Sequence, residues 1–290
     1  MPVSTNDEEE AGPLDETLEQ AASLGDEGRW EEARDLLLEE LEEHAEDPAL
    51  LCLLGIASRE LGEDGEAYEF FRRTLAAQPQ DAIILATAGN GVAVYDDPDA
   101  ESALRLAAIT APDVAFVRVS YGAYLAREGL FADAIRELEA ARELGGDEPG
   151  VRAELAIAYL LAGRTEDGTA ELEEALSIDP HDSWLRGIYG MALLEAGKTE
   201  EAAEALHDFA EERPEDMEGQ LVYALAAAAE GWDDQAWNAL ARAELSAEEA
   251  DMALVQEVEE RIEAGAEEAR AFLHRELAPS VLRERLLQRP

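Results

Sequence analysis

Small and large apolar residues recur along the chain with a period of 34 residues. One small residue returns seven times, at steps of 34 and once of 33: Ala21, Gly55, Ala88, Gly122, Ala156, Gly190 and Ala224. A second small residue follows twelve positions after each, at Ala33, Ala67, Ala100, Ala134, Gly168, Ala202 and Ala236, and a large apolar one four positions later, at Leu37, Phe71, Leu104, Leu138, Leu172, Leu206 and Leu240. So long a register indicates seven tandem repeats of one structural unit.

Each repeat is predicted to be a pair of antiparallel helices. Both halves carry apolar residues at helical spacing over about three turns. A glycine that ends the first helix stands between the halves of six units, at Gly28, Gly62, Gly129, Gly163, Gly197 and Gly231. A proline stops the second helix in four units, at Pro79, Pro112, Pro180 and Pro214. One such hairpin cannot bury its apolar face, so neighbouring units stack into an all-α solenoid.

The third unit has Tyr95-Asp96-Asp97-Pro98 where the others have the turn glycine.

The extent of the repeats predicts how the chain is divided: a disordered acidic N-terminus (1–12), a solenoid (13–246) and a C-terminal helical cap and tail (247–290). The repeats are expected at about 14–47, 48–80, 81–114, 115–148, 149–182, 183–216 and 217–246.

The segments GRWEEARDLL, GEDGEAYEFF, GLFADAIREL and GKTEEAAEAL closely resemble the start of the second helix of the tetratricopeptide repeat. The resemblance covers about residues 14–246, although the large aromatic expected near the start of each first helix is absent. It implies a right-handed superhelix whose concave face is lined by the first helices and binds peptides or protein segments.

Projecting the first helices by this register places mostly apolar residues on the concave face. The predicted partner-binding groove comprises Cys52, Ile56, Leu85, Gly89, Val92, Phe116, Val119, Ala123, Ile157, Leu160, Trp184, Met191, Leu194, Leu221 and Leu225. An apolar surface of this extent usually marks an interaction site. The alternative is a narrow groove in which these residues contact one another or the chain's own end. The run Gly89-Asn90-Gly91 is either a bent, drifted repeat or a depression that accepts a partner side chain.

Three arginines occupy the same place in successive units, at Arg118, Arg152 and Arg186. They either pair with glutamates of neighbouring helices or contact a partner that carries carboxylate or phosphate groups.

The net charge of the chain disfavours some classes of binding partner and is compatible with others. With 69 acidic against 22 basic residues, the chain carries a formal charge of -47, which repels nucleic acids and anionic lipid surfaces. A basic or amphipathic helical protein partner is compatible with this field. The acidity is explained by solubility, by adaptation to high salt or by such a partner.

No segment approaches the ~18 apolar residues that a membrane-spanning helix needs. The N-terminus lacks a signal-peptide pattern, so a cytoplasmic location is expected.

No pattern in the sequence indicates catalysis, a metal or a cofactor. The lone Cys52 has no cysteine to pair with, and His44, His181, His207 and His274 show no metal-ligand spacing. Gly197-Lys198-Thr199 resembles the end of a phosphate-binding loop, but position 192 is Ala where that loop needs a glycine. The sequence therefore predicts a scaffold or chaperone-like adaptor that is not an enzyme, with a self-assembling structural protein as the alternative.

The last 25 residues differ in net charge from the strongly acidic remainder of the chain, because their arginines slightly outnumber their glutamates. Their apolar residues are spaced for amphipathic helices: Phe272, Leu273, Leu277, Val281, Leu282, Leu286 and Leu287. Pro279 is expected to kink or break this stretch. The segment either caps the last repeat, or its part after Pro279 folds back into the groove or docks on a partner.

Overall fold

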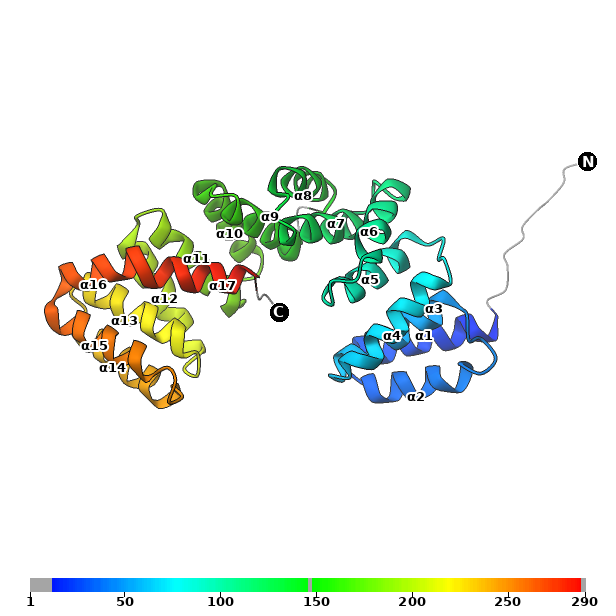
Figure 1. The fold of residues 1–290 in the computed structure, drawn as a ribbon, viewed down its shortest axis with the longest axis horizontal. Helices are drawn as coiled ribbons and strands as arrows, with labels where there is room; N and C mark the ends of the chain where they lie inside the picture. Colours follow the sequence, from blue (N-terminus) through cyan, green and yellow to red (C-terminus); the bar gives the residue numbers. More distant parts are fainter. Residues whose placement is uncertain (1–11, 146–147, 288–290) are drawn as a thin grey trace, which may run out of the picture. The chain divides into compact units, whose positions relative to one another are not determined.

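The computed structural model describes residues 12–145 and 148–287, and within these ranges the protein is an all-α repeat solenoid (Figure 1). It divides after Tyr124, within a helix, into two compact units. Unit 1 contains α1 (Pro13–Asp26), α2 (Trp30–Glu40), α3 (Pro48–Glu60), α4 (Asp64–Ala76), α5 (Ala82–Ala93), α6 (Asp99–Thr110) and the first part of α7 (Ala115–Arg127). The predicted acidic N-terminus, apart from Gly12, lies outside the described residues.

Unit 2 begins at Leu125. It contains the end of α7, then α8 (Phe131–Gly145), α9 (Pro149–Leu161), α10 (Thr165–Ile178), α11 (Ser183–Glu195), α12 (Thr199–Glu212), α13 (Met217–Ala229) and α14 (Asp233–Ser246). Four further segments follow, namely α15 (Met252–Ala264), α16 (Ala266–Phe272), the π-helical turn η1 (Leu273–Leu277) and α17 (Ala278–Leu287). The odd-numbered helices up to α13 are the first helices of the repeats.

Local sequence signals set the start of several first helices. An aspartate precedes each of α3, α5, α11 and α13, and its carboxylate accepts a hydrogen bond from a backbone N–H of the first turn. Such caps satisfy N–H groups that have no partner within the helix. These aspartates are Asp47, Asp81, Asp182 and Asp216.

The turn inside each repeat needs one residue with a positive φ. The six predicted turn glycines have φ between 73° and 78°, a region that costs a residue with a Cβ. In the third repeat Asp96 has φ 53°, one position after Tyr95, which is the place equivalent to the glycines. Two tyrosine hydroxyls hold this turn, since Tyr68 donates to Asp97 at 2.9 Å and Tyr95 donates to the Asp64 carbonyl at 2.9 Å. Asp96 therefore replaces the missing glycine.

One large aromatic side chain fills the space left by glycines on two successive first helices. The fully buried Phe71 ring lies between Gly55 of α3 and Gly91 of α5, where an added Cβ would approach the ring to 2.7 Å at Gly55 and closer still at Gly91. A Cβ at Gly89 would lie 2.9 Å from Leu104. The chain's own side chains thus occupy this place, and of the two alternatives the depression for a partner side chain is not seen here.

The C-terminal segment remains helical through Pro279. Of the expected kink or break, a break does not occur, because the π-helical turn Leu273–Leu277 directly precedes α17. Proline lacks an N–H and its ring clashes with the carbonyl four residues earlier in an α-helix. A wider turn ahead of Pro279 relieves this conflict, as π-bulges commonly do. None of the helices in the described part of the chain has the length and apolar character needed to cross a membrane.

Candidate partner-binding surfaces

The first helices α9, α11 and α13 form one surface of unit 2, called here the first-helix face. The C-terminal segment lies along it: α16 and η1 pack on α13, and α17 packs on α11 and α9 (Figure 1). The helix before them, α15, packs on α13 and α14. The last repeat is therefore covered by α15 and α16, while α17 runs back along the repeats that precede it.

One side of α17 is buried on this face. Val281, Leu282 and Leu286 are at most 4% exposed, and Ala278 is buried beside them. Together with Arg285 they follow a spacing of three and four residues, which places them on one side of a helix. Glu284 on the other side is exposed. The helix is thus amphipathic, and its apolar side is its docking side.

Most groove residues predicted for unit 2 belong to the same buried core as the C-terminal segment. A single apolar cluster joins Val281, Leu282 and Leu286 to first-helix residues, and the partly buried Trp184 packs against it. The buried members of the predicted groove are Ile157, Leu160, Met191, Leu194, Leu221 and Leu225. Of the alternatives that the sequence left open, contact with the chain's own end is the one seen in unit 2. Partner binding by these residues stays a prediction.

Polar contacts fix the C-terminal segment at three points. Arg285 Nη2 lies 2.6 Å from Asp216 Oδ1, and its guanidinium stacks 5.4 Å from the centre of the Phe209 ring. Arg270 of α16 pairs with Glu230 at 2.8 Å and also donates to the Ala229 carbonyl. His274 Nε2 and Thr199 Oγ1 are 3.0 Å apart. Two arginines of the tail thus pair with acidic residues at opposite ends of α13.

Like charges also meet where α17 docks. Glu218 of α13 is partly buried, and this burial raises the pKa of its carboxyl, with Glu284 of α17 adding a second upward contribution. The charge of Arg285 opposes the shift, whereas Asp216 and Asp251 reinforce it. The docked helix therefore brings one attraction, at Arg285, and one repulsion, at Glu284.

The first-helix face is not completely covered. A pocket of about 420 Å³ lies beside α17, with Phe131, Leu160, Leu161 and Leu287 among its lining residues. Glu195 at the end of α11 borders it, and desolvation raises the pKa of that carboxyl. The pocket extends the apolar surface toward α8.

Unit 1 shows a different outcome for the predicted groove. Cys52, Leu85, Gly89 and Val92 are buried among the unit's own side chains. Ile56, Val119 and Ala123 are partly buried, and Phe116 is 45% exposed. Burial raises the pKa of the Cys52 thiol to about 12, so this cysteine is an apolar core residue with little thiolate at neutral pH.

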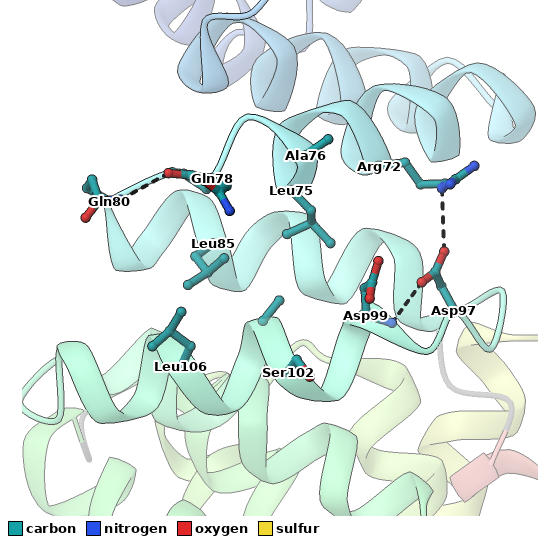
Figure 2. Close-up of a pocket in the computed structure, with 12 residues that line it drawn as sticks. Arg72, Leu75, Ala76, Gln78, Gln80, Leu85, Asp97, Asp99, Ser102 and Leu106 are labelled. Carbon is teal, nitrogen blue, oxygen red and sulfur yellow. Dashed lines mark hydrogen bonds and ion pairs between the residues drawn. The ribbon is translucent and has the colours of Figure 1, made fainter.

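A pocket that the sequence did not predict lies between α4, α5 and α6 of unit 1 (Figure 2). Its volume is about 550 Å³, and Leu75, Leu85 and Leu106 line its middle. The ion pair of Arg72 with Asp97, at 3.7 Å, lies at one end. Leu106, which borders the pocket, and Ile109, three residues later on α6, are 54% and 70% exposed.

The three equivalent arginines pair with the protein itself. Arg152 lies 2.8 Å from Glu171 of the following helix, and Arg186 lies 2.6 Å from Glu212 of the following helix. Arg118 and Arg186 each donate to the carbonyl of the proline six residues earlier. Pairing with neighbouring glutamates, one of the two sequence alternatives, is therefore seen for Arg152 and Arg186.

The polar cluster beside α12 and α13 offers no recognisable reaction centre. His207 Nδ1 and the Tyr223 hydroxyl are 2.8 Å apart, and burial raises the pKa of that phenol to about 12. A phenol with so high a pKa stays protonated at neutral pH and serves as a hydrogen-bonding group. In residues 12–145 and 148–287, no three His, Cys, Asp or Glu side chains are grouped so that they could hold a metal ion.

Comparisons with known proteins agree with this architecture. Family models described as tetratricopeptide repeat match residues 18–82, 125–182 and 165–227, which together exceed half of the chain. No curated protein matches the sequence.

Solved structures show the same fold. TTC0263, a tetratricopeptide repeat protein of Thermus thermophilus, is 28% identical, with 62% of this chain and 98% of that chain covered and a TM-score of 0.50. A tetratricopeptide repeat protein from Parabacteroides merdae is 16% identical, over 88% and 97% of the two chains, with a TM-score of 0.58. In the Cut9–Hcn1 complex of the APC/C, 84% of this chain matches 49% of that chain at 17% identity, with a TM-score of 0.69.

Proposed function

Because the chain belongs to the tetratricopeptide repeat family, we propose that it is a non-catalytic scaffold that binds a helical segment of a partner protein on the first-helix face of unit 2. Repeats of this family are in general protein-interaction modules rather than enzymes. The family therefore supports the class of function, and the contacts within unit 2 support the choice of surface and ligand.

The position of α17 is the observation that carries this proposal. An amphipathic helix that binds in a groove contacts it through apolar residues spaced by three and four positions. Ala278, Val281, Leu282 and Leu286 have this spacing and are buried on the first-helix face. The face thus accepts an amphipathic helix, and α17 serves as a template for the partner.

The charges on and around α17 indicate which residue types the partner helix should carry. The docking side of α17 carries Arg285, which pairs with Asp216 at 2.6 Å. The surrounding protein has a formal charge of -47, so a basic residue at this place is attracted while an acidic one is repelled. The proposed ligand is a helix with aliphatic residues at the positions of Val281, Leu282 and Leu286 and an arginine or lysine at that of Arg285.

A labelled peptide with the sequence of residues 278–290 tests the proposal by fluorescence anisotropy. The receptor is the full chain with Leu282→Asp, because a charge at this 2%-exposed position should release its own α17. The matched control receptor carries Leu287→Asp, which alters a 50%-exposed leucine of the same helix. We expect the peptide to bind the first receptor at least tenfold more tightly than the second.

A second peptide is the control that tests whether binding is due to charge alone. It carries aspartate in place of the leucine that corresponds to Leu286, which is 4% exposed in the docked helix. The unaltered peptide should bind and this variant should not. If hydrogen exchange shows that α17 is released from the Leu282→Asp chain and neither peptide binds, the proposed site is wrong.

A further inference from the structure

We propose that α17 is an autoinhibitory segment that closes the first-helix face of unit 2 to partners and is held there by the ion pair between Arg285 and Asp216. This inference rests on the proposed function, since it assumes that partners use the face on which α17 lies. It adds that the protein switches between a closed and an open form of this face.

The segment before α17 is anchored separately from it. Ala269, Phe272 and Leu273 are at most 5% exposed within the core of unit 2. Arg270 pairs with Glu230 and with the Ala229 carbonyl at the end of α13. Release of α17 therefore leaves α16 in place over the last repeat, so that opening the face does not uncover the end of the solenoid.

A natural hinge lies between these two parts. The π-helical turn Leu273–Leu277 joins α16 to α17, and Pro279 follows at the second position of α17. Proline removes one backbone hydrogen bond from the helix, and π-helical turns are rare and occur often at functional sites. The helix is thus least well bonded where α17 must separate from α16.

Arg285 provides the electrostatic attraction that offsets the repulsion between α17 and α13. Its side chain is 14% exposed, and the guanidinium lies between the Asp216 carboxylate at 2.6 Å and the Phe209 ring. Glu218 and Glu284 repel each other nearby. Without this arginine, the repulsion between Glu284 and Glu218 would remain while the attraction to Asp216 would be lost.

A tethered helix competes strongly with a partner. Because α17 is covalently linked to its site, its effective concentration there is on the order of millimolar. A partner then binds only the fraction of molecules whose face is open, and its apparent affinity falls by that fraction. Weakening the hold of α17 should therefore raise the affinity for a partner without any change in the groove itself.

The experiment compares three full-length chains: wild type, Arg285→Glu and Arg283→Glu. Arg283 lies on the exposed side of the same helix, so its substitution changes the net charge equally and serves as the matched control. The labelled peptide of residues 278–290 reports binding, and hydrogen exchange of residues 278–287 reports release of α17. We expect Arg285→Glu to raise peptide affinity about tenfold or more and to speed exchange, and Arg283→Glu to match wild type.

Each other outcome has a distinct meaning. If the peptide binds wild type as tightly as Arg285→Glu, α17 is not inhibitory, although the proposed binding site stands. If exchange of α17 is the same in all three chains, the ion pair is not what holds the helix and the inference is wrong. If Arg285→Glu frees α17 and the peptide still does not bind, the proposed function fails together with the inference.

A milder variant covers the case in which Arg285→Glu misfolds. Arg285→Gln removes the ion pair without adding a negative charge, and its exchange rate and peptide affinity should lie between those of wild type and Arg285→Glu. Circular dichroism checks that the helical content of each chain is retained. Wild-type behaviour of a folded Arg285→Gln chain, in both exchange and binding, would overturn the inference.

Discussion

Replacing Gly91 by alanine should destabilise unit 1, although alanine is the better helix former. Gly91 lies inside α5, where the exchange gains about 1 kcal/mol of helix propensity. An added Cβ, however, would approach the Phe71 ring to well under 3.0 Å. Phe71 cannot retreat, because it is 1% exposed and Gly55 lies on its other side.

Overpacking of this kind costs about 1–3 kcal/mol. With no room for the ring to move, the upper part of that range applies, and it exceeds the gain in helix propensity. The free energy of unfolding should therefore fall by about 1–2 kcal/mol. Urea unfolding followed by circular dichroism measures the midpoint, and hydrogen exchange of residues 82–93 locates the loss in α5.

Gly65→Ala is the matched control within the same unit. Gly65 also lies in a helix, α4, but an added Cβ there would meet nothing within 4 Å. Its stability should stay the same or rise by up to about 1 kcal/mol. The double variant Gly91→Ala with Phe71→Leu should recover part of the loss. An unfolding midpoint for Gly91→Ala equal to or above that of wild type would refute the packing argument.

Three further predictions follow from the geometry. Asp96→Gly should raise the free energy of unfolding by about 0.5 kcal/mol in a urea titration, since relief of the left-handed backbone exceeds the entropy cost of glycine; a lower value would contradict this. Replacing Arg118, Arg152 and Arg186 with Gln should lower the melting temperature, at about 1 kcal/mol for each ion pair lost, and leave peptide affinity unchanged; the reverse pattern would assign them to a partner. Burial raises the pKa of the Glu218 carboxyl, and Glu284 of α17 raises it further. The charged form of Glu218 is therefore repelled by Glu284, and lowering the pH from about 7 toward about 5 should increase protection of α17 from exchange; Glu218→Gln should show that protection already at neutral pH.

The fold is readable from the sequence because its constraints are local and repeated. A turn that needs positive φ selects glycine, and six glycines at one phase mark six turns. The turn of the third repeat lacks this signal, yet Asp96, one residue after the phase of the glycines, also has a positive φ. Asp and Asn tolerate this region better than other residues with a Cβ. The period therefore locates the turn to within one residue even where the residue type does not.

The candidate site was only partly readable, because a helical register gives the direction of a side chain but not what covers it. Leu194 and Leu225 were predicted to line the groove, yet both are buried in a core that also contains residues of the C-terminal segment, far away in the sequence. The amphipathic pattern of the tail fits a cap and a groove equally well. Pro279 suggested a break, but the preceding π-helical turn, for which the sequence has no simple signature, keeps the helix continuous.

Contact between α17 and α9 has a consequence for how unit 2 folds. Repeat proteins normally fold through neighbouring repeats alone, so that folding can start anywhere and spread. Here residues 278–287 contact residues 149–161, which couples the end of the chain to a repeat made much earlier during synthesis. Contacts over such sequence separations slow folding. The first-helix face of a nascent chain thus stays open until residues 278–287 have been synthesised, and only then can α17 close it.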